Sequence, residues 1–173
     1  MTLAVPDPTL HRAYKPGAMA LLVAGAAIVG ALGFEHIGGI LPCPLCLEQR
    51  YAYYAGLPLL FAALVLLSAG QRRWAALLFA AVALGFLANA GLGVYHAGAE
   101  WHFWPGPLTC SGAQPLSTSV GGLLDALPST NVIRCDEAAW RFAGISLAGW
   151  NVVVSLLVLA LSLRAAAESL RSR

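Results

Sequence analysis

Four long apolar runs constrain the fold of this chain more than any other feature. Residues 17–34 form an uncharged run of 18 residues, and similar runs follow at 51–70, 74–96 and 144–163. A helix needs roughly 20 apolar residues to cross the hydrocarbon core of a bilayer. Only 10% of the residues are charged, against about 25% in a soluble domain. The predicted fold is an all-α integral membrane protein, an antiparallel bundle of four transmembrane helices.

Polar segments separate these runs within a single membrane domain, residues 1–173. Residues 1–16 contain three prolines and predict a short disordered arm. The rival interpretation of the first run is a cleaved signal peptide with a small-x-small site at Ala31-Leu32-Gly33. We expect a retained helix, because the run is longer than the roughly 7–15 apolar residues of a signal peptide.

The positive charges predict the orientation. Seven of the ten Lys and Arg residues lie in the two termini and the 71–73 turn: Arg12, Lys15, Arg72, Arg73, Arg164, Arg171 and Arg173. Lys and Arg concentrate in cytoplasmic segments, so both termini are predicted to be cytoplasmic and the loops 35–50 and 97–143 to face outward. The net charge is only +2 and the charges form no basic run, which argues against nucleic acid as a partner.

All four cysteines fall in the two outward loops: Cys43, Cys46, Cys110 and Cys135. Disulfides persist in oxidising compartments and are rare in the cytosol. The charge distribution and the redox chemistry therefore favour the same orientation.

The Cys-x-x-Cys motif at Cys43 and Cys46 indicates redox chemistry. Pro44 suits the first position of a helix, which places Cys43 at the N-cap and Cys46 in the first turn. A helix N-terminus favours a thiolate, and Arg50 lies four residues after Cys46 on the same helical face, where it would favour a thiolate or an anionic ligand.

Other interpretations of this motif remain open. The two cysteines could form a structural disulfide. They could also belong to a zinc site, although no further ligands have the spacing of one. Arg50 could simply extend its head group to the membrane interface. Attachment of haem would require a histidine after Cys46, where Leu47 stands.

The second pair, Cys110 and Cys135, lies 25 residues apart in the long loop. It predicts either a structural bridge or a relay that exchanges disulfides with the first pair. Apolar residues spaced by three and four over 116–127 predict a short amphipathic helix, lying on the membrane or on top of the bundle. His96 lies at the end of the third run. It could donate a hydrogen bond to a carbonyl group at the bilayer edge, or it could belong to an interfacial aromatic belt.

Taken together, these motifs resemble the bacterial disulfide bond formation protein B (DsbB-type) family over about residues 17–165. The residues that carry the resemblance are Cys43-Pro44-Leu45-Cys46 with Arg50, Tyr95-His96-Ala97-Gly98, Trp104 through Gly112, and Cys135-Asp136 followed by Trp140, Phe142, Gly144, Ile145, Trp150 and Asn151.

The resemblance implies a multi-pass enzyme of the bacterial inner membrane with its cysteines in the periplasm. Such an enzyme reoxidises a periplasmic thioredoxin-fold (DsbA-like) thiol oxidase and passes the electrons to ubiquinone or menaquinone, without a metal. Arg50 would polarise a quinone oxygen, and His96 looks like the quinone-proximal histidine. A DsbI-type branch of the family acts on different partners.

The resemblance also implies a role for each cysteine. Cys110 looks like the cysteine that the reduced partner attacks, and Cys135 like its bridge partner. Cys43 looks like the cysteine that exchanges with the loop pair, and Cys46 like the one that engages the quinone ring.

Two alternatives come from other classes. A vitamin K epoxide reductase-like relay has its quinone-side Cys-x-x-Cys after the loop cysteines, whereas here it comes before them. A non-catalytic membrane subunit would hold both pairs as structural disulfides.

Overall fold

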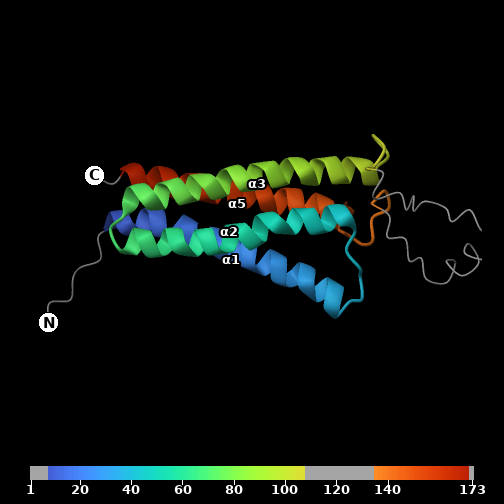
Figure 1. Ribbon diagram of the computed structural model, residues 1–173, viewed down its shortest axis with the longest axis horizontal. Helices are drawn as coiled ribbons and strands as arrows, with labels where there is room; N and C mark the ends of the chain where they lie inside the picture. Colours follow the sequence, from blue (N-terminus) through green and yellow to red (C-terminus); the bar gives the residue numbers. More distant parts are fainter. Residues whose placement is uncertain (1–7, 108–134, 172–173) are drawn as a thin grey trace, which may run out of the picture.

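The computed structural model describes residues 8–107 and 135–171, with side chains from residue 12 onward. Four long helices dominate it, as Figure 1 shows. Their bounds are α1 (Pro8–His36), α2 (Pro44–Ser68), α3 (Arg72–Glu100) and α5 (Leu147–Arg171). All four are long and apolar enough to cross a membrane, which confirms the predicted fold class.

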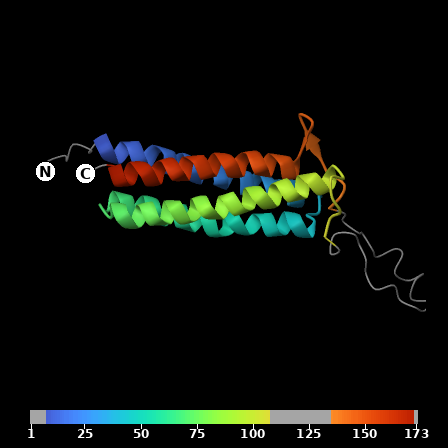
Figure 2. The ribbon, with the colours of Figure 1, turned by 90° about the horizontal axis from the view of Figure 1, so that it is seen from above.

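The four helices form one antiparallel bundle. α1 packs on α2 and α5, and α3 packs on the same two neighbours. The start of α1, the α2–α3 turn and the end of α5 lie together at one end of the bundle (Figures 1 and 2). We call this the turn end. The α1–α2 connection and the start of α5 lie at the opposite end, which we call the site end.

The helices extend beyond most of the predicted runs. α1 already begins at Pro8 and continues through Pro16, so the prediction of a disordered arm is wrong from residue 8 onward. α2 begins at Pro44, which shortens the predicted 35–50 loop to residues 37–43. The amphipathic helix predicted over 116–127 lies outside the described residues.

Small residues let the helices approach closely, as is common in membrane bundles. A Cβ on Gly17 would lie 2.7 Å from Cζ of Phe79, and a Cβ on Gly56 would lie 2.7 Å from Cε2 of Phe86. Both phenylalanines are fully buried. Large apolar side chains such as Leu22 instead point out of the bundle, where lipid would cover them.

A short β-hairpin precedes α5 and was not predicted. Its strands are β1 (Arg141–Phe142) and β2 (Ile145–Ser146). The two turn residues, Ala143 and Gly144, have φ angles of 52° and 81°, the positive values that a tight hairpin turn requires.

The hairpin determines where α5 begins. The hydroxyl of Ser146 accepts a hydrogen bond from the backbone N–H of Gly149 at 3.2 Å, as an N-capping side chain does. Trp150 also donates from Nε1 to the carbonyl oxygen of Phe142 at 3.1 Å. The helix therefore starts at Leu147 rather than at the predicted residue 144.

Candidate functional site

The Cys-x-x-Cys pair lies at the first turn of α2. Cys43 is the N-cap residue, and its sulfur accepts a hydrogen bond from the backbone N–H of Cys46 at 3.2 Å. The two sulfur atoms are 2.7 Å apart and both cysteines are free thiols. This confirms the predicted helix start at Pro44. Proline suits that position because it has no N–H that would need a partner.

The two thiols share one proton-donating contact. Cys43 donates a hydrogen bond to the sulfur of Cys46. This bond is the main reason that the pKa of Cys43 is raised, and burial raises it further, whereas the backbone N–H of Cys46 lowers it. The Cys43 thiol therefore keeps its proton at neutral pH and needs a base before it can react.

Cys135 approaches the pair from the segment that precedes the β-hairpin. It is fully buried and disulfide-bonded. The sulfur atoms of Cys43 and Cys135 and a ring nitrogen of His96 all lie within 4.8 Å of one another. The structure thus brings together one cysteine from each predicted pair. Cys110 lies outside the described residues.

The same cluster has residue types that bind metals. A sulfur engaged in a disulfide is no thiolate, and the thiolate is the form that coordinates a metal. Because Cys135 is disulfide-bonded, the arrangement suits thiol–disulfide exchange better than metal binding.

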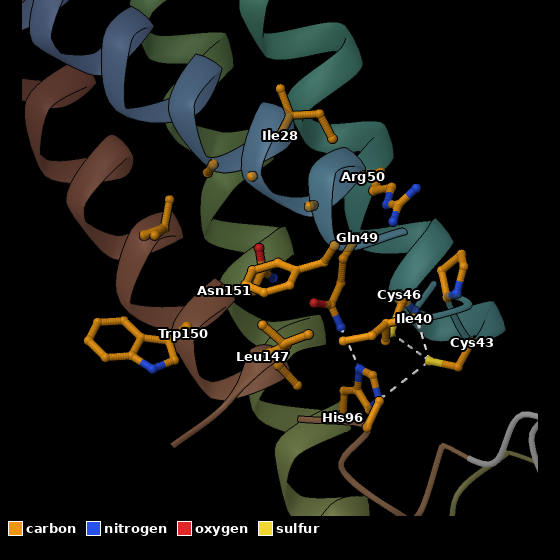
Figure 3. A pocket seen from close by; sticks show the side chains of 18 of the residues that line it. Ile28, Ile40, Cys43, Cys46, Gln49, Arg50, His96, Leu147, Trp150 and Asn151 are labelled. Carbon is orange, nitrogen blue, oxygen red and sulfur yellow. Dashed lines mark hydrogen bonds between the residues drawn. The ribbon is translucent and has the colours of Figure 1, made fainter. Parts of the chain in front are cut away.

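His96 is buried inside the bundle, only 2% exposed. The side-chain amide of Gln49 donates from Nε2 to Nδ1 of His96 at 2.8 Å. The other nitrogen, Nε2, lies 3.6 Å from the sulfur of Cys43 and 3.8 Å from Oε1 of Glu100. Figure 3 shows Gln49, His96 and Cys43 in this order. His96 therefore contacts the thiol pair.

Tyr95 and Trp104 pack against each other next to His96, and the His96 ring is not part of this aromatic pair. The rings of Tyr95 and Trp104 stack with their centroids 6.1 Å apart. Trp104 also donates from Nε1 to the backbone carbonyl of Tyr95 at 2.8 Å. These rings are partly exposed, as interfacial aromatics are.

Arg50 forms an ion pair with Glu35 of α1 through Nη1 and Oε2. An interfacial arginine of the kind considered above keeps its head group in water, whereas the side chain of Arg50 is only 11% exposed. The contact joins α2 to the end of α1, one turn below the thiol pair.

A cavity of about 330 Å³ opens beside these residues. Its polar lining includes Cys43, Cys46, Gln49, Arg50 and His96 (Figure 3), together with the acidic residues Glu100 and Glu137. Apolar residues line most of the rest, among them Ile28, Phe34, Ile40, Leu147 and Val154. All four helices contribute to its wall. The site can thus hold a largely apolar molecule against a thiol and a guanidinium group.

A polar network lies next to this cavity inside the bundle. Tyr53 donates its hydroxyl proton to Oδ1 of Asn151 at 2.6 Å. Asn89 donates from Nδ2 to the hydroxyl of Ser155 at 2.9 Å. Tyr53 and Asn151 also line the cavity, so the network supports its wall.

Three residues of the site were missed at the sequence level: Glu35, Gln49 and Glu100. Gln49 lies three residues after Cys46, and Glu100 lies four residues after His96. These spacings place each on the helical face of a predicted site residue, so the signal was present. Glu35, directly after an apolar run, had only its charge to mark it.

Comparisons with known proteins identify the family of this chain. The family model described as "Disulfide bond formation protein DsbB" matches residues 15–165. Among curated proteins, "Disulfide bond formation protein B" of Marinobacter nauticus is 34% identical over 154 residues, 84% of this chain and 86% of that protein. The protein of the same name from Aromatoleum aromaticum is 36% identical, over 77% of this chain and 82% of that protein.

A third relative, "Disulfide bond formation protein B 2" of Pseudomonas putida, is 36% identical over 150 residues, 83% of this chain and 84% of that protein. No solved structure shows a significant match.

Proposed function

Because the chain belongs to the family of disulfide bond formation protein DsbB, we propose that it is a quinone-dependent protein-disulfide oxidoreductase. It reoxidises a periplasmic thioredoxin-fold (DsbA-like) dithiol protein and passes the electrons to a membrane quinone. The observation that carries this proposal is the position of Cys43, which lies within 4.8 Å of the Cys135 sulfur and beside the cavity.

The cysteines act in series in this proposal. The partner dithiol reduces the Cys110–Cys135 disulfide, and that pair then reduces the Cys43–Cys46 disulfide. In each exchange a thiolate attacks a sulfur, so one S–S bond breaks as another forms. The short distance between the Cys43 and Cys135 sulfurs supports the second exchange, because it requires little movement of either backbone.

The cavity fits a quinone as the final electron acceptor. Ligand cavities usually measure roughly 300–1,000 Å³ and are mostly apolar with a few polar groups, and this one has about 330 Å³ with such a lining. Arg50 would bind a quinone oxygen, His96 would lie beside the quinone, and Cys46 would face the ring. Ubiquinone or menaquinone, when bound, supplies the capacity to accept two electrons and two protons.

The proposed location is the bacterial inner membrane, as the family implies, and the charges support cytoplasmic termini. Within the described residues, the turn end holds Arg12, Lys15, Arg72, Arg73, Arg164 and Arg171. Arg50 and Arg141 belong to the site end. By the preference of Lys and Arg for the cytoplasmic side, the site end and its cysteines then face the periplasm.

The test is quinone turnover. The purified protein is mixed with a reduced thioredoxin-fold dithiol protein and with ubiquinone or menaquinone, and the quinone absorbance is followed. We expect turnover that Cys46→Ser abolishes, while Ser68→Ala, at the other end of α2, leaves it unchanged. Full turnover in Cys46→Ser would exclude the proposed role of Cys46. Two disulfides that resist both mild reductant and quinone would instead indicate a non-catalytic subunit.

A further inference from the structure

Glu100 is an acidic side chain that the proposed function does not yet use. It ends α3, is 8% exposed, and lies four residues after His96. Within the part of the chain that the structure describes, its Oε2 atom is buried without a hydrogen-bond partner. A buried carboxyl group without full pairing costs free energy, so its presence at the thiol pair calls for an explanation.

His96 links Cys43 to Glu100 by two successive contacts. The sulfur of Cys43 lies 3.6 Å from Nε2 of His96, and Nε2 lies 3.8 Å from Oε1 of Glu100. Catalytic hydrogen bonds are often this long before the substrate binds and tighten when it does. His96 therefore stands between a thiol and a carboxyl group.

Gln49 holds the histidine ring on its other side, at Nδ1. A glutamine amide can present either its N–H or, after half a rotation, its carbonyl oxygen. The N–H of Gln49 donates to Nδ1 when that nitrogen carries no proton, and the carbonyl oxygen accepts from Nδ1 when it does. Gln49 can thus support the neutral ring in both tautomers as well as the protonated ring.

The chemistry of the pair requires a proton acceptor. When two thiols form a disulfide, one S–S bond forms, two electrons pass to the oxidant, and two S–H protons leave. The hydrogen bond to Cys46 and burial raise the pKa of Cys43, so its proton does not leave unaided at neutral pH. Outside the thiol pair itself, His96 is a base in contact with the Cys43 sulfur.

We propose that Glu100 accepts the Cys43 proton through His96 when the Cys43–Cys46 pair is oxidised. Nε2 of His96 takes the thiol proton while Gln49 accepts from Nδ1–H, and Nε2 then passes a proton to the Glu100 carboxylate. This inference rests on the proposed redox role of the pair. His96 touches the reacting sulfur, and Glu100 acts through it as a positioning residue.

The surroundings of Glu100 come from three further elements. Arg141 of β1 and Ser146 of β2 interact with its carboxyl group, and Cys43 and Cys46 face it from the start of α2. Arg141 supplies a positive charge and Ser146 a hydroxyl group. Burial disfavours a carboxylate at this position, whereas Ser146 and Arg141 stabilise one.

The test follows oxidation of the pair as a function of pH. The reduced full-length protein, without added quinone, is mixed with glutathione disulfide, and mass spectrometry quantifies the peptide holding Cys43 and Cys46. We expect Glu100→Gln to slow disulfide formation at neutral pH by about 100-fold, the lower end of the range for general base catalysis. The difference should disappear at alkaline pH, where hydroxide removes the proton.

The matched control is Glu48→Gln, which removes an exposed carboxylate next to Gln49 and should leave the pH profile unchanged. Glu100→Asp keeps the charge and should show a smaller rate loss with the pH dependence retained. An equal rate loss at every pH, or no loss, in Glu100→Gln would overturn the proposal.

Thermal unfolding shows whether each variant folds. If Glu100→Gln does not fold, Glu100→Asp decides, and an unaltered rate at neutral pH in that variant overturns the proposal. Failure of the proposed function has another signature. In that case the unchanged protein shows no quinone turnover, while the glutathione experiment still shows the effect of Glu100.

Discussion

The two ends of the bundle are built from different kinds of residue. At the turn end, buried alanines, Leu67 and Phe79 fill the space between the helices, and a glycine lets Phe79 approach. The buried polar side chains there are small, such as Ser162 and Ser169. At the site end, the buried side chains include Gln49, His96 and Glu100, and a cavity remains beside them. Close packing of apolar groups stabilises one end, whereas the other end keeps polar groups and space for a ligand.

From this contrast we predict that stability and reactivity depend on different halves of the same helices. α2 contributes Cys43, Cys46 and Arg50 to the site at its start, and Leu64 and Leu67 to the core near its end. Substitutions in one half should therefore affect one property and spare the other.

The largest effect is expected from Cys43→Ser. A serine cannot exchange disulfides, so electron transfer from the partner dithiol to quinone should stop completely, while the melting temperature stays the same. Quinone absorbance and thermal unfolding measure the two properties. A melting temperature that falls as far as the activity would show that the two halves are not separate.

Gly17→Leu tests the turn end. The new side chain would overlap Phe79, and overpacking of this kind costs about 1–3 kcal/mol. The melting temperature should fall, while the folded fraction keeps its turnover per molecule. Gly85→Leu is the matched control, because a Cβ there meets nothing within 4 Å. Equal melting temperatures for the two variants would contradict the close packing.

Gln49→Leu removes the hydrogen bond to Nδ1 of His96 at nearly constant volume. Such a bond contributes about 0.5–1.5 kcal/mol, which corresponds to a roughly 2- to 10-fold lower turnover number. Gln49→Glu, which can still accept from Nδ1–H, should recover most of the rate. A turnover number that is the same in all three proteins would mean that His96 needs no such support.

The smallest effect is expected from Glu35→Gln. Arg50 then loses its charged partner in α1, and its guanidinium is no longer held in one position beside the cavity. Partly exposed ion pairs contribute about 1 kcal/mol or less, so the apparent KM for quinone should rise up to about 5-fold at an unchanged kcat.

Steady-state kinetics over a series of quinone concentrations measures this change. Arg50→Gln serves as the reference and should raise KM further. If Glu35→Gln lowered kcat instead and left KM constant, Glu35 would not act by positioning Arg50.

Local features of the site could be predicted from the sequence, because they depend on neighbours within one turn. Cys43 at the N-cap and Pro44 at the start of a helix follow from the chemistry of helix ends, and the structure confirms both. The start of α5 could not be predicted in this way, since it depends on a hairpin closed by two residues with positive φ.

Contacts between distant segments were decided by the tertiary structure alone. His96 and Cys43 are separated by 53 positions in the chain, and Arg50 and Glu35 by 15. No local pattern encodes such distances, because they depend on how far each helix extends and how it rotates against its neighbours.

The sequence by itself determined that the chain is a bundle of membrane-spanning helices with a thiol pair at a helix start. The reason is physical: a bilayer excludes unpaired backbone groups, so apolar runs of this length become helices. Only the tertiary structure decided which side chains meet at that thiol pair. Packing of α3 against α2 brings His96 and Glu100 to it, and the segment before the hairpin brings Cys135. Packing of α1 against α2 places Glu35 against Arg50, one turn further along.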